Sequence, residues 1–177
     1  SVFDFADRFP ELHSEDYVIL IKLHGSTLSQ IVDHYRNLGS KFKNFIFVEE
    51  SNLALLLGGS DLMISDVSSA FMEFMAQNKP VILYNNPQRF DYYGFNTEDI
   101  EWKWRDLGTE CNSFDELKKV LPVILINGDN KHSIREKYGK ELFADLKGNA
   151  SANVWKETLE IVDKPSIVNV ITISLVI

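Results

Sequence analysis

The sequence lacks two features that define many proteins: paired cysteines and an excess of positive charge. Its 177 residues include one cysteine, Cys111, which can form no internal disulfide. We therefore expect a reducing compartment and a packing role for this side chain. The 18 Lys and Arg against 26 Asp and Glu give a formal net charge of −8. Since affinity for a phosphate backbone depends on Lys and Arg, we exclude a general nucleic-acid binder, and an anionic ligand must be held locally.

Long hydrophobic runs are also absent. The longest apolar stretch, residues 167–177, contains Asn169, Thr172 and Ser174 and is shorter than the roughly 20 residues that span a bilayer. We expect an edge strand, the start of a further domain or a strand paired with another copy. No signal-peptide pattern is present, and the chain begins at Ser1 rather than at methionine. We interpret it as a piece excised from a larger protein.

What the sequence does contain is an alternation of strand-like and helical patterns. Hydrophobic residues make up 45% of the chain, enough for a sizeable core. We predict strands at residues 17–23, 45–48, 62–65 and 81–84, and helices at 28–38, 52–57 and 70–77 between them. We expect Gly39 and the pair Gly58-Gly59 to end two of these helices. Because parallel strands need helical crossovers, the alternation predicts an α/β fold with a Rossmann-like, doubly wound parallel sheet.

The second half of the chain is less regular. Residues 85–104 are polar and aromatic without clear periodicity, which indicates a functional loop or an irregular insertion. Ser113 and Glu116 have capping-box spacing before a helix at 117–121. Two more helices are predicted at 133–146 and 150–162, with Gly148 as a left-handed cap between them. We therefore divide the chain into a Rossmann-like domain at 1–163 and a hydrophobic tail at 164–177.

The stretch from 62 to 84 carries the strongest chemical signal. A strand ending at Ser65 runs into the small turn Val67-Ser68-Ser69, and a helix carrying Glu73 follows. The first amides of a helix lack partners within it and lie at the positive end of its dipole, so phosphate is a natural ligand. One serine can cap the helix and the other can bind a ligand, or both can be simple caps. Glu73 could accept hydrogen bonds from sugar hydroxyls, or it could simply face solvent.

Four motifs occur in an order and spacing that resemble one known family. They are Lys22-Leu23-His24, the segment 65–69 with Glu73, the segment 78–84, and Gly148-Asn149-Ala150-Ser151. Together they resemble the C-terminal, nucleotide-binding half of the CDP-glycerol glycerophosphotransferases. This is the teichoic-acid polymerase group with the GT-B architecture, and the resemblance covers residues 17–162.

The resemblance implies roles for individual residues. His24 would face the diphosphate of the donor and act in catalysis, although a histidine after a strand is often only a structural hydrogen-bonding group. Ser68 and Ser69 would hold phosphate, and Glu73 would bind the ribose. The donor site would be completed by Lys22 and Ser151.

The resemblance also implies the reaction and its partners. A glycerol-phosphate or glycosyl group would pass from a nucleotide-diphosphate donor, such as CDP-glycerol, to a hydroxyl of a polyol or sugar polymer at the cell surface. We expect no other cofactor and no metal, because the four histidines are scattered. The acceptor half would lie in a missing N-terminal domain. We expect a cytoplasmic protein, and the rest of it could associate peripherally with the inner face of the membrane.

Two alternatives remain open. One is a UDP-sugar epimerase or another glycosyltransferase of GT-B type, which would use a similar turn and helix carboxylate. The other is a non-catalytic α/β binding domain in which the serine turn is only a cap. Under the transferase hypothesis, we expect this piece alone to bind nucleotide weakly and not to turn over.

Overall fold

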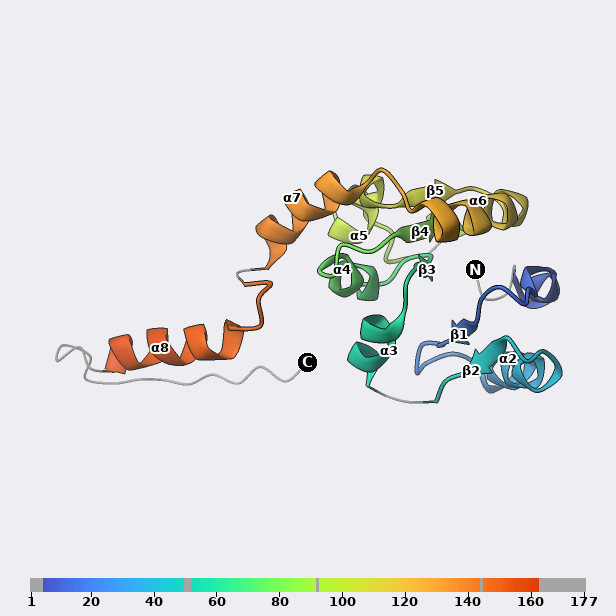
Figure 1. Cartoon of the computed structure of the whole chain (residues 1–177), viewed down its shortest axis with the longest axis horizontal. Coiled ribbons are helices and arrows are strands. Elements are labelled where there is room, and N and C mark those ends of the chain that lie inside the picture. Colours follow the sequence, from blue (N-terminus) through green and yellow to red (C-terminus); the bar gives the residue numbers. More distant parts are fainter. Residues whose placement is uncertain (1–4, 50–51, 92, 144, 163–177) are drawn as a thin grey trace. The chain divides into compact units, whose positions relative to one another are not determined.

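The structure is a computed structural model that describes residues 5–49, 52–91, 93–143 and 145–162. These residues fall into two units, Ser1–Tyr138 and Gly139–Ile177, and each is described by itself (Figure 1). The predicted tail at 164–177 lies outside the described residues, so the boundary predicted at 163 stays a prediction.

The first unit alternates strands and helices along the chain (Figure 1). After a short 3-10 helix, η1 (Phe9–Leu12), the order is β1 (Ile19–Ile21), α2 (Ser29–Lys41), β2 (Phe45–Phe47), α3 (Leu53–Gly59), β3 (Met63–Ser65), α4 (Ala70–Met75) and β4 (Val81–Tyr84). The irregular part holds η2 (Arg89–Asp91), α5 (Ile100–Lys103) and η3 (Arg105–Leu107), and then come β5 (Thr109–Cys111), α6 (Phe114–Asn127) and α7 (His132–Leu142). The second unit contains the end of α7 and α8 (Ala150–Val162).

Every strand pairing is parallel among the described residues, which confirms the predicted α/β class. The strands form two small sheets, β1-β2 and β3-β4-β5. In the larger sheet, Met63 lies opposite Val81, and Tyr84 lies opposite Cys111. The residues of β4 are all buried, as expected for a central parallel strand covered on both faces.

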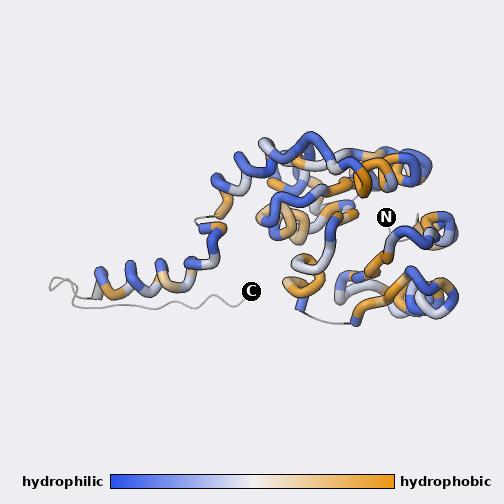
Figure 2. The backbone as a smooth tube through the Cα atoms, in the orientation of Figure 1, coloured by the Kyte–Doolittle hydropathy of each residue, from blue (hydrophilic) through white to orange (hydrophobic). Residues whose placement is uncertain are grey.

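One hydrophobic core joins the two sheets. Ile21 and Phe45 from the smaller sheet belong to the same buried cluster as Ile82 and Cys111 from the larger one. Figure 2 shows apolar residues concentrated along the strands and along α3 and α6. Cys111 is fully buried, and burial, together with nearby Glu116, raises the pKa of its thiol to about 11. The thiol therefore stays protonated at neutral pH and packs as a small apolar group.

Of the two predicted glycine stops, the one at Gly39 was wrong, whereas the one at Gly58-Gly59 agrees with the structure, because α3 ends at Gly59. Helix α2 continues through Gly39 to Lys41. A Cβ atom at position 39 would lie 3.3 Å from the carbonyl oxygen of Phe45 and 3.3 Å from the amide nitrogen of Phe47. Gly39 therefore allows α2 to approach β2 closely, and packing outweighs its low helix propensity.

Two other predictions also differ in detail. Strand β5 was not predicted, because Thr109-Glu110-Cys111 is too short and polar to stand out and pairs only through β4. Helix α7 ends at Leu142 rather than at 146. Gly148 has the expected positive φ of 83°, but it lies in the turn before α8 rather than at the end of α7.

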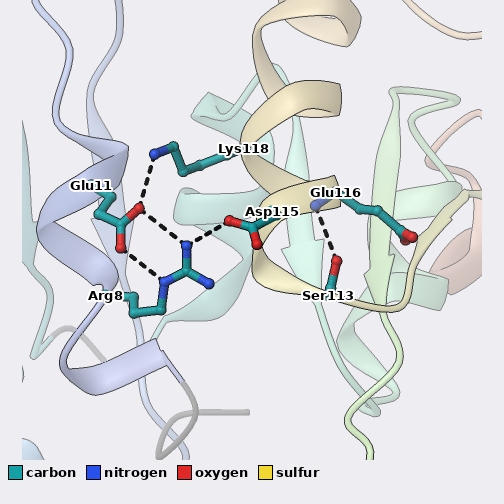
Figure 3. Close-up of polar contacts among 6 residues, drawn as sticks. All are labelled: Arg8, Glu11, Ser113, Asp115, Glu116 and Lys118. Atoms are coloured by element: carbon teal, nitrogen blue, oxygen red, sulfur yellow. Dashed lines mark hydrogen bonds and ion pairs between the residues drawn. The ribbon is translucent and has the colours of Figure 1, made fainter.

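The predicted Ser113 cap at the start of α6 is confirmed (Figure 3). The Ser113 hydroxyl accepts a hydrogen bond from the Glu116 amide at 3.2 Å. The Glu116 carboxylate reaches back and accepts from the Asn112 amide at 2.7 Å. The Ser113 hydroxyl therefore satisfies an amide in the first turn of α6, and Glu116 satisfies the amide one residue before the N-cap, so together they fix the start of the helix at Phe114.

A group of exposed ion pairs links η1 to α6 (Figure 3). Arg8 lies 2.8 Å from Glu11 and 2.6 Å from Asp115, and Lys118 lies 2.9 Å from Glu11. The Arg8 guanidinium also covers the ring of Phe114 at 4.5 Å. These contacts join segments that are far apart in sequence.

We expect the carboxyl group of Glu11 to titrate well below its ordinary range. Hydrogen bonds from Arg8 and Lys118 lower its pKa from 4.5 to about 2. Because the folded-state pKa is depressed, the associated stabilisation is present above pH 4.5 and is lost as the pH falls toward 2. A carbon-detected NMR titration of the Glu11 carboxyl measures this value. Arg8→Gln should return it toward 4.5, and a wild-type midpoint already near 4.5 would contradict the assignment.

Candidate functional site

The carboxyl edge of the β3-β4-β5 sheet brings three polar segments together. Ser65 ends β3 and is followed by the Ser68-Ser69 turn, and Tyr84 ends β4 and is followed by Asn85. Cys111 ends β5 next to the capping box of α6. Ligands of open parallel α/β sheets bind beyond the carboxyl ends of the strands, so this edge is the candidate site.

The serine turn has the local structure of a helix start. The Ser68 hydroxyl accepts a hydrogen bond from the Ala70 amide at 3.2 Å, and the Ser68 carbonyl accepts from the Phe71 amide at 3.2 Å. Ser68 is half-buried, whereas Ser69 is exposed and its hydroxyl caps no amide. Ser68 therefore stabilises the turn, and the Ser69 hydroxyl is the one presented to solvent.

Glu73 lies on the outer side of α4. The buried residues of this helix are Phe71, Phe74 and Met75, which share the face packed into the core. The spacing of 3.6 residues per turn places Glu73 opposite that face, and its side chain is exposed. Ligand binding by Glu73 stays a prediction.

His24 and Lys22 follow the other sheet, in the turn after β1, and both are exposed. The Nδ1 atom of His24 accepts a hydrogen bond from the Ser26 amide at 3.2 Å and lies 2.7 Å from the Ser26 hydroxyl oxygen. Since Nδ1 acts as the acceptor, a neutral His24 carries its proton on Nε2. Among the described residues, no hydrogen bond or ion pair joins His24 or Lys22 to the serine turn. A shared crevice between them therefore stays a prediction.

Ser151, the last predicted site residue, belongs to the second unit. It lies in the first turn of α8 and is exposed. The loop before α8 is organised by Asp145, whose carboxylate accepts from the amides of Lys147 at 2.7 Å and Asn149 at 2.9 Å.

The sequence interpretation missed a buried arginine at the carboxyl edge. The Arg105 Nη1 donates to the carbonyl oxygen of Asp66 at 2.8 Å, and Nη2 donates to that of Tyr84 at 3.2 Å. Arg105 is 7% exposed, and burial lowers its pKa, while the nearby Glu110 carboxylate opposes that shift. Nothing in residues 102–106 of a single sequence marks an arginine for burial, so this contact could be found only in three dimensions.

Asn85 organises the same edge. Its backbone amide donates to the Cys111 carbonyl at 2.7 Å. Its side-chain amide donates to Glu110 and to Asn112, each at 2.9 Å. Arg89 follows at the rim, where its guanidinium lies 4.3 Å from the ring centre of Phe90. The edge is therefore a polar surface with charges of both signs.

Two shallow hollows occur elsewhere in the first unit, with volumes of about 380 and 430 Å³. Residues of α2, of β2 and of the segment before β1 line them, and no predicted site residue does. Across the described ranges, no cluster of three His, Cys, Asp or Glu side chains could hold a metal ion. No helix in that part of the chain combines the length and the apolar character needed to cross a membrane.

Comparison with known proteins agrees with the motifs. Residues 2–160 match the family model described as CDP-Glycerol:Poly(glycerophosphate) glycerophosphotransferase. A stretch of 72 residues is 35% identical to the teichoic acid glycerol-phosphate primase of Bacillus subtilis (strain 168), and it covers 40% of this chain and 17% of that relative. The matched stretch therefore spans only a small part of the relative's length. Because the family model extends over most of the sequence, the chain belongs to the CDP-glycerol:poly(glycerophosphate) glycerophosphotransferase family.

Proposed function

We propose that this chain is the donor-binding domain of a transferase that acts in the synthesis of a cell-wall polymer. The observation that carries the proposal is the family match over residues 2–160, which includes the serine turn at the carboxyl edge of the larger sheet. The donor is a nucleotide diphosphate such as CDP-glycerol, and the acceptor is a hydroxyl of a polyol or sugar polymer. The acceptor half and the catalytic base belong to a part of the protein outside this chain, and the donor site faces the cytoplasm.

The reaction transfers a phosphoryl group that carries glycerol. The acceptor oxygen forms a bond to the phosphorus next to the glycerol, and the bond from that phosphorus to the bridging oxygen breaks. Cytidine monophosphate leaves with the bridging oxygen, and the proton of the acceptor hydroxyl passes to the base. Negative charge grows on the leaving phosphate. Hydrogen-bond donors placed around this phosphate therefore lower the activation barrier.

Residues of this chain supply these hydrogen-bonding groups. The Ser69 hydroxyl and the serine turn hold the diphosphate, and the Nε2 proton of His24 is donated to the leaving phosphate. The ammonium group of Lys22 adds a positive charge beside His24. Glu73 accepts hydrogen bonds from the ribose hydroxyls.

Calorimetric titration of the 177-residue chain tests the proposal. We expect CDP-glycerol to bind weakly, with a dissociation constant on the order of 1 mM, and UDP-glucose to bind more weakly still. Ser69→Ala removes a hydrogen bond to a charged ligand and should weaken CDP-glycerol binding about tenfold. Ser40→Ala, which alters an exposed serine of α2, is the matched control and should leave binding unchanged.

Two results would overturn the proposal. If neither nucleotide binds or raises the unfolding temperature, the chain is a binding module of another kind. If UDP-glucose binds better than CDP-glycerol, the donor class is wrong.

A further inference from the structure

Arg105 connects the ends of two neighbouring strands from inside the protein. Its guanidinium donates to the carbonyl oxygen of Asp66, just after β3, and to that of Tyr84, the last residue of β4. These acceptors lie 39 and 21 residues away in the sequence. Arg105 therefore holds together the starting points of the serine turn and of the loop after β4.

The two carbonyl groups matter because of where they lie. Beyond the last hydrogen bond of a sheet ladder, a strand's carbonyl oxygens need other donors. An oxygen without a donor at this edge would present the negative end of a peptide dipole to an arriving phosphate. Arg105 donates to both oxygens and adds a positive charge behind them, so the edge becomes more favourable for an anion.

The carboxylates of Glu110 and Asp66 both attract the charge of Arg105. Its Nε atom is buried without a hydrogen bond and lies 3.5 Å from the Glu110 carboxylate, which is shared with the side-chain amide of Asn85. Burying a guanidinium with an unsatisfied donor costs free energy. An apolar contact could join the two strands without burying a charge. We therefore expect the charge of Arg105 at the candidate site to affect the binding of a ligand.

We infer that Arg105 is a positioning residue for the diphosphate of the donor, an inference that rests on the proposed function. It acts through the Asp66 carbonyl, which fixes the turn that carries Ser68 and Ser69, and through its charge at the carboxyl edge. Since the guanidinium is buried, it does not contact the ligand itself. Its contribution should therefore grow with the negative charge of the ligand.

A charge series of ligands measures this contribution. Cytidine, cytidine monophosphate and cytidine diphosphate are titrated into the wild-type chain and into Arg105→Met by calorimetry. We expect Arg105→Met to weaken the binding of cytidine diphosphate about tenfold or more and that of cytidine less than about twofold. The reason is that only the charged ligand is repelled by the carbonyl oxygens of Asp66 and Tyr84 when Arg105 no longer donates to them. Arg36→Met removes an exposed arginine of α2 and should weaken no ligand in a charge-dependent way.

Two further variants separate positioning from folding. Arg105→Lys keeps the charge but cannot bridge two carbonyl oxygens in the same way. Its affinity for the diphosphate should therefore lie between those of the wild type and Arg105→Met. Arg105→Gln keeps a donor without the charge and should resemble Arg105→Met. Thermal unfolding identifies the variants that fold, and if Arg105→Met does not, the lysine and glutamine variants give the comparison.

The outcomes distinguish the two proposals. If the wild-type chain binds none of the cytidine ligands, the proposed function fails, and the role of Arg105 fails with it. A second outcome is that the wild-type chain binds the diphosphate, but every folded Arg105 variant loses affinity for cytidine by the same factor as for the diphosphate, or loses no affinity at all. In that case the positioning role is overturned and the proposed function stands.

Discussion

Asp129→Ala should lower the free energy of unfolding by about 3–5 kcal/mol, because it leaves a buried guanidinium without its counter-ion. Arg135 in α7 is 2% exposed at its side chain, and Asp129 is 3% exposed. The carboxylate accepts from Nη1 at 2.7 Å and from Nη2 at 2.8 Å. The same guanidinium donates to the Asn78 side-chain oxygen and to the Leu107 carbonyl, each at 3.1 Å. Urea unfolding followed by tryptophan fluorescence measures the change.

Two controls make this result specific. Asp33→Ala breaks the exposed ion pair with Arg36 and should leave the urea midpoint almost unchanged, since exposed pairs contribute little. The double variant Asp129→Leu with Arg135→Met replaces both charges by apolar groups and should recover much of the lost stability. Equal midpoints for Asp129→Ala and Asp33→Ala would contradict the prediction.

The same pair has a pH signature. Burial raises the pKa of Asp129, but hydrogen bonds from Arg135 and from the Lys131 amide outweigh it and hold the pKa below its ordinary 3.8. The stabilisation is therefore present above that value and is lost as the pH falls through the lower folded-state pKa. Asp129→Ala should lose less stability than the wild type between neutral and acid pH.

Gly108→Ala should destabilise the protein by about 1–3 kcal/mol through overpacking beside β4. A Cβ atom at this position would lie 2.7 Å from the carbonyl oxygen of Val81 and 3.2 Å from the side chain of Leu83. The Val81 oxygen belongs to the backbone of a fully buried strand, so it can move only if β4 shifts relative to β5. The urea midpoint and the unfolding temperature measure the loss.

Gly58→Ala is the matched control for this change. Gly58 lies in α3 and has no atom within 4 Å of the position that a Cβ would occupy. Alanine has less freedom in the unfolded chain and a higher helix propensity, so this variant should be more stable by up to about 1 kcal/mol. If both alanine variants shift stability in the same direction, close approach at Gly108 is not the reason.

Both changes test the scaffold rather than the ligand site. Val81 begins β4, whereas Tyr84 and Asn85, at its other end, lie at the carboxyl edge. Variants at Gly108 and Asp129 should therefore change the unfolding midpoint much more than the affinity of the folded chain for nucleotide. Arg105 variants should show the opposite balance, with affinity for the charged ligand changing most.

Local sequence patterns determined the order and type of most elements. The strand 81–84 and the helix 150–162 have the predicted bounds, because a continuous apolar run marks a buried strand and a long helix shows helical periodicity. The capping box of Ser113 and Glu116 was also predictable, since its hydrogen bonds join residues three or four positions apart. Of the predicted site residues, Ser68, Ser69 and Glu73 were indicated by the strand, turn and helix pattern as well as by the family motifs. Lys22, His24 and Ser151 come from the family motifs, and the roles of all six remain to be tested.

Only the tertiary structure decided the features that depend on distant partners. Strand β5 exists through its pairing with β4, and Gly39 continues its helix because β2 packs against it. Arg105 became a candidate positioning residue only once Asp66 and Tyr84 were seen beside it. The physical reason is that helix periodicity and caps are set by neighbours within one or two turns, whereas burial and strand pairing are set by residues that only folding brings together.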